Sequence, residues 1–85
     1  MAIEILYFAW VREAIGRDGE WVDPPTDILD VAGLIEWLAG RSGGHAEAFA
    51  DVARLRYAVD QAFARPDTSI AGVRELAIFP PVTGG

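Results

Sequence analysis

The amino-acid sequence predicts one small α+β domain in which a single main helix packs across a sheet. Three observations predict it: strand-like apolar segments near both ends of the chain, a hairpin after the first of them, and one helical apolar stripe in the middle. A hairpin with one helix across the sheet makes a two-layer arrangement. The chain has 85 residues, so it buries only about 60% of its unfolded surface and needs most of its apolar residues for the core.

The first predicted strand covers residues 3–11, IEILYFAWV, which are rich in β-branched and aromatic side chains. Its alternation defines two faces, with Ile3, Ile5 and Tyr7 on one and Leu6 and Phe8 on the other. We expect a short helical turn after it, ended by Gly16, and then a turn around Asp18-Gly19. Residues 20–22 would form the second strand of a hairpin, which Pro24-Pro25 stops.

The main helix is predicted from an apolar stripe at helical spacing, formed by Val31, Leu34, Ile35 and Leu38. Asp30 is the expected N-cap, and Gly40 is the expected C-cap. Leu29 precedes the N-cap, where it can pack onto Leu34 as a hydrophobic staple.

The second half of the chain contains a weaker helix and two further strands. After a glycine-rich loop, residues 45–53 favour a second helix, and residues 55–60 alternate as a half-exposed strand with Leu55, Tyr57 and Val59 inward. Residues 64–69 turn the chain, and residues 75–79 form the last strand, which ends because Pro80 has no N–H for a ladder. We expect the first and last strands to be central neighbours.

Composition excludes several classes of function. There is no cysteine, so neither a disulfide framework nor a thiolate metal site can form. The net charge of −6 argues against nucleic acid and fits basic partners. The apolar start contains Glu4 and lacks a basic region, and no run approaches a membrane span. We therefore expect a cytoplasmic protein without a membrane or nucleic-acid partner.

The sequence shows no conventional active site. Ser42, Ser69 and the single histidine, His45, have no spacing that indicates a catalytic triad, and we expect His45 to be a solvated surface residue. One histidine and scattered acids predict no metal site. Asp27 and Asp30 are better explained as helix-start residues than as acid–base catalysts.

The last residues favour a stiff arm with a slim tip. Pro80 and Pro81 fix φ and bias their neighbours toward extended backbone, which Val82 and Thr83 also prefer. The reach from Pro80 to Gly85 is about 20 Å, at roughly 3.3–3.6 Å per residue. Such an arm suits insertion into a tight pocket, although chain ends are also commonly unselected.

The functional group at the tip is the α-carboxylate of Gly85, which no side chain obstructs. With a pKa of roughly 3.3–3.7 it is ionised at neutral pH and a poor electrophile. It needs activation, for instance as an acyl-adenylate, before an incoming sulfur can give a thiocarboxylate. Such a sulfur carrier requires no cysteine.

Three stretches carry a resemblance to a known family: LYFAWVREAIG near the start, VDQ at residues 59–61, and AIFPPVTGG at the end. Together they resemble the small, sulfur-carrying subunits of molybdopterin synthase, a family of ubiquitin-like sulfur carriers. The resemblance covers essentially the whole chain in order and length, and its terminal motif is highly specific.

The resemblance implies a ubiquitin-like β-grasp domain over residues 1–79, with a mixed sheet, and an extended Gly-Gly tail over residues 80–85. An ATP-dependent adenylating enzyme would activate Gly85, and a sulfurtransferase donor would convert it to a thiocarboxylate. The tail would then deliver sulfur to cyclic pyranopterin monophosphate in a large subunit, within a heterotetramer, during molybdenum cofactor biosynthesis. The carrier would bind no cofactor stably and no metal, since ATP belongs to the activating enzyme, and the large subunit would hold the active site.

Carried over by position, Gly85 is the activated group and Gly84 its slim neighbour. The inserted arm comprises Phe79, Pro80, Pro81, Val82 and Thr83. Phe8 and Arg12 match a recurrent family stretch, and we interpret them as core packing and a salt bridge. Trp10, Trp21 and Trp37 are candidates for a partner interface.

The sequence departs from the family pattern in two places. Asp60 stands where family members often carry Asn, and residues 71–75, AGVRE, replace an acidic Asp-Gly-Asp-Glu turn. The departures concern the turn before the last strand and its part in partner contacts.

Three alternatives stay open. The chain could carry sulfur for another pathway, thiamine synthesis or tRNA thiolation, or act as a ubiquitin-like protein modifier. All seven basic residues are arginine, and the missing lysine counts against conjugate chains through side chains. A plain binding module would be indifferent to loss of Gly84-Gly85.

Overall fold

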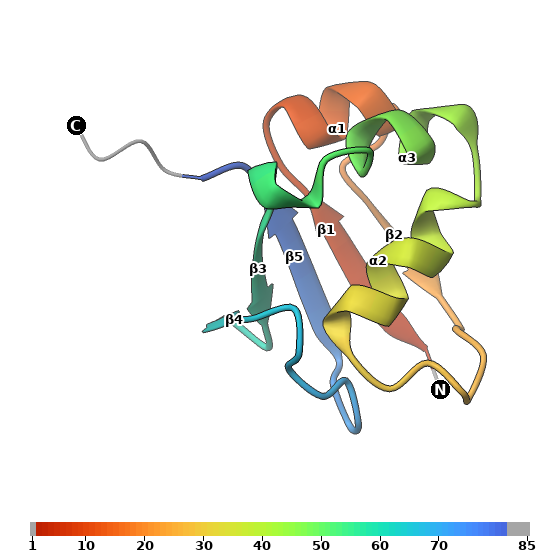
Figure 1. Ribbon diagram of the computed structural model, residues 1–85, viewed down its shortest axis with the longest axis vertical. Helices are drawn as coiled ribbons and strands as arrows, with labels where there is room; N and C mark the ends of the chain where they lie inside the picture. The colour runs from red at the N-terminus through yellow and green to blue at the C-terminus, as the bar shows by residue number, and fades with distance from the viewer. Residues whose placement is uncertain (1, 82–85) are drawn as a thin grey trace.

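The structure is a computed structural model that describes residues 2–81. Its elements in chain order are β1 (Ile3–Tyr7), α1 (Trp10–Ile15), β2 (Gly19–Val22), α2 (Val31–Ala39), α3 (Gly43–Ala48), the 3₁₀ turn η1 (Val52–Arg54), β3 (Arg56–Val59), β4 (Ala62–Ala64) and β5 (Glu75–Phe79). Figure 1 shows α2 lying across the sheet, with α1 and α3 together at one end.

The five strands form one mixed sheet in the order β2-β1-β5-β3-β4. β1 and β5 run parallel at the centre, with Ile5 beside Leu76, and the other three pairs are antiparallel. The predicted central position of the first and last strands is therefore confirmed. A hairpin, a crossing helix and a parallel central pair make the ubiquitin-like β-grasp arrangement that the family resemblance implies.

The core lies between α2 and one face of the sheet. The predicted stripe of α2 is confirmed, because all four of its residues, Val31, Leu34, Ile35 and Leu38, are buried. The predicted N-cap is also present, since the Asp30 carboxylate accepts a hydrogen bond from the Gly33 N–H at 2.8 Å. The predicted staple is wrong: Leu34 is fully buried, whereas the Leu29 side chain is 73% exposed.

The first strand is shorter than predicted. The chain leaves β1 at Ala9, whose φ of 54° turns it into α1, so the apolar residues Trp10 and Val11 belong to a helix. Val11 is completely buried, and the sequence pattern alone did not separate a buried helix start from a longer strand. Gly16 ends α1 as predicted, in the left-handed conformation at φ 88°.

The sequence prediction missed β4. Asp60 and Gln61 both have positive φ, 48° and 72°, and form a two-residue hairpin turn that pairs Val59 with Ala62. Glutamine is not a residue typical of such turns, so the Asp-Gln pair is not recognisable as a hairpin turn from its residue types.

The weaker helix begins two residues earlier than predicted. Ser42 caps α3 by accepting a hydrogen bond from the His45 N–H at 3.2 Å. The helix ends at Ala48, and the last two residues of the predicted segment belong to the separate turn η1. Gly44 brings α3 against α1: a Cβ at this position would lie 2.5 Å from the Ala14 carbonyl oxygen. Within residues 2–81, every helix is too short or too polar to cross a membrane.

Candidate functional site

The predicted inserted arm begins where the central strand β5 ends. Phe79 is the last residue of β5, lies beside Arg56 of β3, and is followed by the partly buried Pro80. The described chain then leaves the body of the domain at Pro81 (Figure 1). Val82, Thr83, Gly84 and Gly85 lie outside the described residues, so their predicted roles remain predictions.

The base of the arm adjoins the face of the sheet that the helices do not cover, which we call the open sheet face. Strand alternation and register place on it Glu4, Leu6, Trp21, Arg56, Ala58, Phe63, Glu75, Ala77 and Phe79. The rings of Phe63 and Phe79 lie 6.2 Å apart between centroids. An apolar surface thus continues from β4 to the base of the arm.

Large apolar side chains are unusually exposed on and beside this face. Phe63 is 87% exposed, Trp21 64% and Phe8 45%. Apolar side chains that gather on one face indicate a surface for another protein, and aromatic residues supply much of the binding energy in such interfaces. The open sheet face is therefore the candidate partner-binding site.

The interpretation of Phe8 as core packing is wrong. Tyr7 takes the inward position, so Phe8 points outward just after β1 and lines a shallow groove together with Arg12 and Trp21. Arg12 is exposed, and its predicted salt bridge is absent among residues 2–81. Both residues that match the family stretch are thus available to a partner.

The three tryptophans, all interface candidates, differ in environment. Trp21 pairs with Glu4 across the β1–β2 hairpin and is presented by the open sheet face. Trp10 and Trp37 are partly buried and each carries a guanidinium over its ring: Arg54 at 4.8 Å and Arg41 at 5.2 Å from the ring centroids. Cation–π stacking thus gives these two a packing role.

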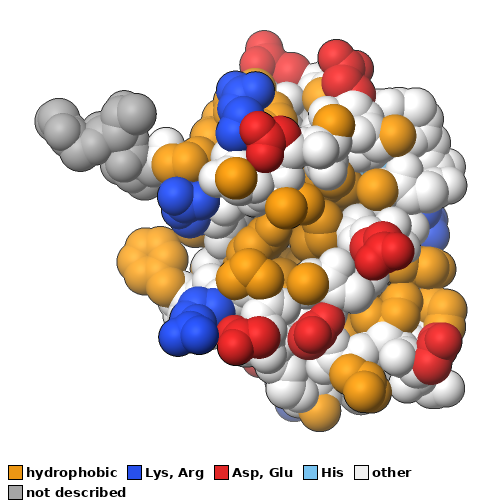
Figure 2. Space-filling model, viewed as in Figure 1, with side chains coloured by type: hydrophobic (Ala, Val, Ile, Leu, Met, Phe, Trp, Pro, Cys, Tyr) orange, Lys and Arg blue, Asp and Glu red, His pale blue; other side chains and the backbone are white. Residues whose placement is uncertain are grey.

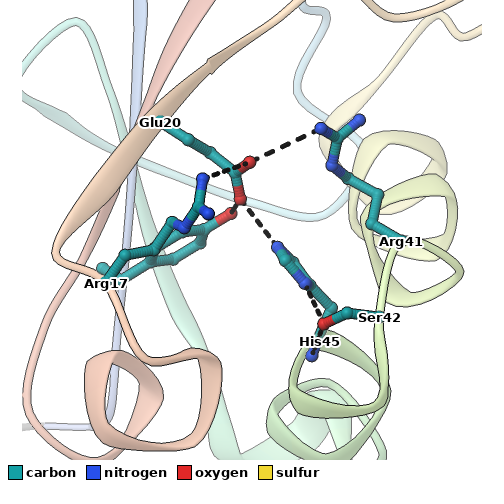
Figure 3. A network of polar contacts seen from close by, with 6 residues as sticks. Arg17, Glu20, Arg41, Ser42 and His45 are labelled. Atoms are coloured by element: carbon teal, nitrogen blue, oxygen red, sulfur yellow. Dashed lines mark hydrogen bonds and ion pairs between the residues drawn. The ribbon is translucent and has the colours of Figure 1, made fainter.

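The prediction that His45 is a solvated surface residue is wrong. His45 is only 6% exposed, and its Nε2 lies 2.7 Å from Glu20 Oε2 (Figure 3). The same oxygen accepts a hydrogen bond from the Tyr7 hydroxyl at 2.7 Å, and Arg17 and Arg41 approach the other carboxylate oxygen at 3.5 Å. The sequence could not show this network, because it joins β1, β2 and α3, and Glu20 and His45 alone are 25 residues apart in the chain.

Glu20 is ionised in this network despite its burial. Burial alone would raise the pKa of Glu20, but the hydrogen bonds from Tyr7 and His45, with the charges of His45 and Arg41, outweigh it and hold the pKa below its ordinary value. Burial and the neighbouring carboxylate raise the pKa of the Tyr7 hydroxyl well above its ordinary value. The hydroxyl therefore stays protonated and donates to Glu20.

Ser42, His45 and Glu20 form a line of polar contacts that resembles a catalytic triad, because Ser42 Oγ lies 2.7 Å from His45 Nδ1. The Ser42 oxygen, however, already accepts the His45 N–H as the cap of α3. Neither Ser42 nor His45 lines any of the five prominent cavities formed by residues 2–81. The arrangement fixes α3 to the sheet and offers no substrate site. Across the same residues no cluster of His, Asp and Glu could hold a metal ion.

The mixed five-stranded sheet, the crossing helix and the apolar open sheet face define a ubiquitin-like β-grasp protein with a surface for a partner. The chain matches the model of the ThiS family over residues 5–85, and it belongs to that family.

Two curated relatives agree with this assignment over nearly their full lengths. The chain is 39% identical to the molybdopterin synthase sulfur carrier subunit of Escherichia coli, over 98% of this chain and 99% of that protein. It is 35% identical to the protein of the same name from Mycosarcoma maydis, over 99% and 94%. Among solved structures, SAMP1 from Haloferax volcanii superposes with a TM-score of 0.73 at 26% identity, covering all of both chains.

Proposed function

We propose that this chain is the sulfur carrier subunit of a molybdopterin synthase. Its Gly85 carboxylate is adenylated, converted to a thiocarboxylate, and donates sulfur to cyclic pyranopterin monophosphate in a large subunit. The observation that carries the proposal is the terminal AIFPPVTGG motif, which begins within the central strand β5 of a β-grasp domain in a member of the ThiS family. The names of the two curated relatives support it.

The chemistry starts from an ionised, unreactive carboxylate. A Gly85 carboxylate oxygen attacks the α-phosphate of ATP on the activating enzyme, and pyrophosphate leaves. The donor releases sulfur at the sulfide level, which attacks the acyl carbon of the adenylate; AMP leaves and the thiocarboxylate forms. The chain has no cysteine, so the sulfur comes from outside and stays on the terminal acyl group.

The fold supports this chemistry by holding the arm in position for a partner enzyme. β5 is paired on both sides, by β1 and β3, so the arm starts from a firmly held position. The open sheet face, with Phe63 and Phe79 at the base of the arm, supplies the docking surface for the large subunit. When the open sheet face is bound to the large subunit, the tip can reach only a limited distance into it. Two carriers on two large subunits would give a heterotetramer.

The carrier contributes no catalytic side chain of its own. The only histidine is held between Glu20 and Ser42 in the interior. We place the active site of sulfur transfer in the large subunit, and the enclosed position of this histidine is consistent with that assignment.

The first test is intact-protein mass after incubation with ATP, the activating enzyme and a sulfur donor. We expect a gain equal to one oxygen replaced by sulfur in the full chain and none in a chain lacking Gly85. Adding pyranopterin and the large subunit should then consume the thiocarboxylate. If only enzymes of thiamine synthesis or tRNA thiolation consume the thiocarboxylate, the chain is a sulfur carrier of that other pathway. A covalent adduct with other proteins would favour the protein-modifier alternative. No mass change with a demonstrably active enzyme set would reject carrier chemistry.

A further inference from the structure

A second apolar surface lies on the helix-covered side of the sheet, away from the open sheet face. It is a groove of about 730 Å³ between α2, η1 and the β3–β4 hairpin. Its floor consists of the buried residues Ile35, Phe49, Leu55 and Tyr57. Figure 2 shows this apolar hollow in the middle of the molecule, open to solvent. Its volume falls in the range of ligand and peptide sites in proteins.

Small side chains keep the groove open. Ala32 and Ala39 on α2 face Ala53 of η1 and Ala64 of β4 across it. A small domain needs most of its apolar residues buried, so longer side chains that cover the floor would be expected at these positions. The floor instead stays accessible to an apolar segment from outside.

The two walls of the groove differ in charge. Arg56 and Arg65 line the groove on its sheet side, and Glu36 lines it on the α2 side. The Arg56 side chain starts on the open-face side of β3, beside Phe79, and its guanidinium reaches the rim of the groove at η1. Figure 2 shows basic groups along the left side of the hollow, and acidic groups above, below and to the right of it. The Arg56 guanidinium donates to the Ala53 and Leu55 carbonyl oxygens at 3.1 and 2.8 Å, which fix its position, and no carboxylate of residues 2–81 pairs with it.

Arg65 is weakly engaged. Its guanidinium lies 3.4 Å from Asp67, but both side chains are largely exposed, at 82% and 73%. An exposed ion pair of this kind contributes little stability, so it yields readily to a competing carboxylate. The sheet wall thus offers two guanidiniums to an incoming acidic group, in a protein whose net charge is −6.

From this complementarity we propose that the groove binds an amphipathic segment of a partner protein, with apolar side chains on the floor and carboxylates along the flank that faces Arg56 and Arg65. The segment docks as a helix in a groove, because the alanines of both walls allow a close approach. The floor of the groove lies across the sheet from the open sheet face, and the two surfaces meet at Arg56. The proposal does not depend on the carrier chemistry of Gly85.

The test uses two short synthetic helix-forming peptides with the same leucine stripe, one flanked by glutamates and one by lysines, titrated into the ¹⁵N-labelled full chain. We expect the glutamate peptide to shift the amide signals of Ala32, Ala39 and Ala64 and to bind more tightly than the lysine peptide. The overall negative charge alone predicts the opposite order of affinities. Tighter binding of the glutamate peptide would therefore indicate a specific effect of the groove.

Two substitutions with matched controls localise the binding. Ala32→Glu should weaken the glutamate peptide about fivefold or more, because it adds a carboxylate at an exposed groove position. Ala46→Glu, equally exposed on α3 but outside the groove, should leave it unchanged. Arg65→Ala should weaken it by up to about fivefold, whereas Arg74→Ala should not. Tighter binding of the lysine peptide, shifts confined to the open sheet face, or no shift in the groove would each overturn the proposal.

Discussion

Glu20 is the residue at which burial and charge oppose each other most strongly. Its side chain is 6% exposed, yet it accepts hydrogen bonds from Tyr7 and His45 and lies near two guanidiniums. A buried carboxylate with this many partners is costly to leave incomplete. Glu20 thereby holds β2 and α3 together, next to the central strand β1.

Replacing Glu20→Gln should lower the free energy of unfolding at neutral pH by about 1–3 kcal/mol, because the charge-assisted hydrogen bonds are lost. The folded-state pKa of Glu20 lies below its unfolded value, so its contribution is complete above roughly pH 4.3 and is lost as the pH falls through the folded pKa. Urea unfolding at neutral and acid pH should therefore show a difference between the two proteins that shrinks in acid. Exposed Glu47→Gln is the control, and a difference independent of pH would contradict the assignment.

Asp60 explains one departure from the family pattern. It lies at φ 48°, a conformation that Asp and Asn tolerate better than most residues, and its Oδ1 accepts the Arg74 and Glu75 N–H groups, both at 3.0 Å. The side chain thus caps the turn that leads into β5. An asparagine supplies the same oxygen.

Asp60→Asn should therefore change stability by less than about 0.5 kcal/mol, and Asp60→Ala should cost about 1–2 kcal/mol through two unpaired N–H groups and an unfavourable φ. Thermal unfolding of the three proteins measures both effects. If Asp60→Asn were as damaging as Asp60→Ala, the charge rather than the oxygen would stabilise the turn.

At the scale of elements, the contact between α1 and α3 depends on the absence of a side chain at Gly44. A Cβ there would lie 2.5 Å from the Ala14 carbonyl oxygen and 3.2 Å from the Ile15 Cα, and both of these are backbone atoms. Neither atom can move without shifting α1. The two helices are therefore held at a distance that only glycine permits.

Gly44→Ala should destabilise the protein by about 1–3 kcal/mol, the usual cost of overpacking. Gly43→Ala is the matched control, because a Cβ at Gly43 meets nothing within 4 Å among the described residues and alanine is the better helix former. Urea denaturation of the two variants distinguishes packing from helix propensity. Equal stability of both variants would mean that α3 shifts to accommodate the side chain.

The elements that the sequence predicted are those with strong local signals. The α2 stripe, its Asp30 cap and the strand at residues 75–79 depend on periodicity and on proline, which act within a few residues. The missed features depend on the tertiary structure: β4 follows a turn with Gln61 at positive φ, and His45 is buried only because Glu20, distant in sequence, receives it. For the same reason the terminal motif could be recognised in the sequence, whereas the open sheet face could not, because it depends on which strands pair.

At the scale of the whole molecule, the two sides of the sheet have separate uses. The helix side holds the core and the groove, and the open sheet face presents aromatic side chains beside the arm. Since Phe63 is 87% exposed, it contributes little to the core. Its position beside Phe79 makes it the best single probe of docking.

Phe63→Ala should leave the unfolding temperature nearly unchanged and weaken binding to the large subunit by about tenfold or more, the loss typical of an aromatic interface residue. Calorimetric titration measures the affinity. Val52→Ala, 57% exposed at the groove, is the control and should bind normally. Normal binding by Phe63→Ala would exclude this end of the face from the interface.

The parallel pairing of β1 with β5 also determines how the domain bears a mechanical load. A pull on the arm acts along β5, and neighbours hold this strand on both edges. The force therefore shears both ladders at once, whereas a pull across an edge strand would break its hydrogen bonds one after another. We therefore expect the domain to stay folded when it is pulled by its last residues.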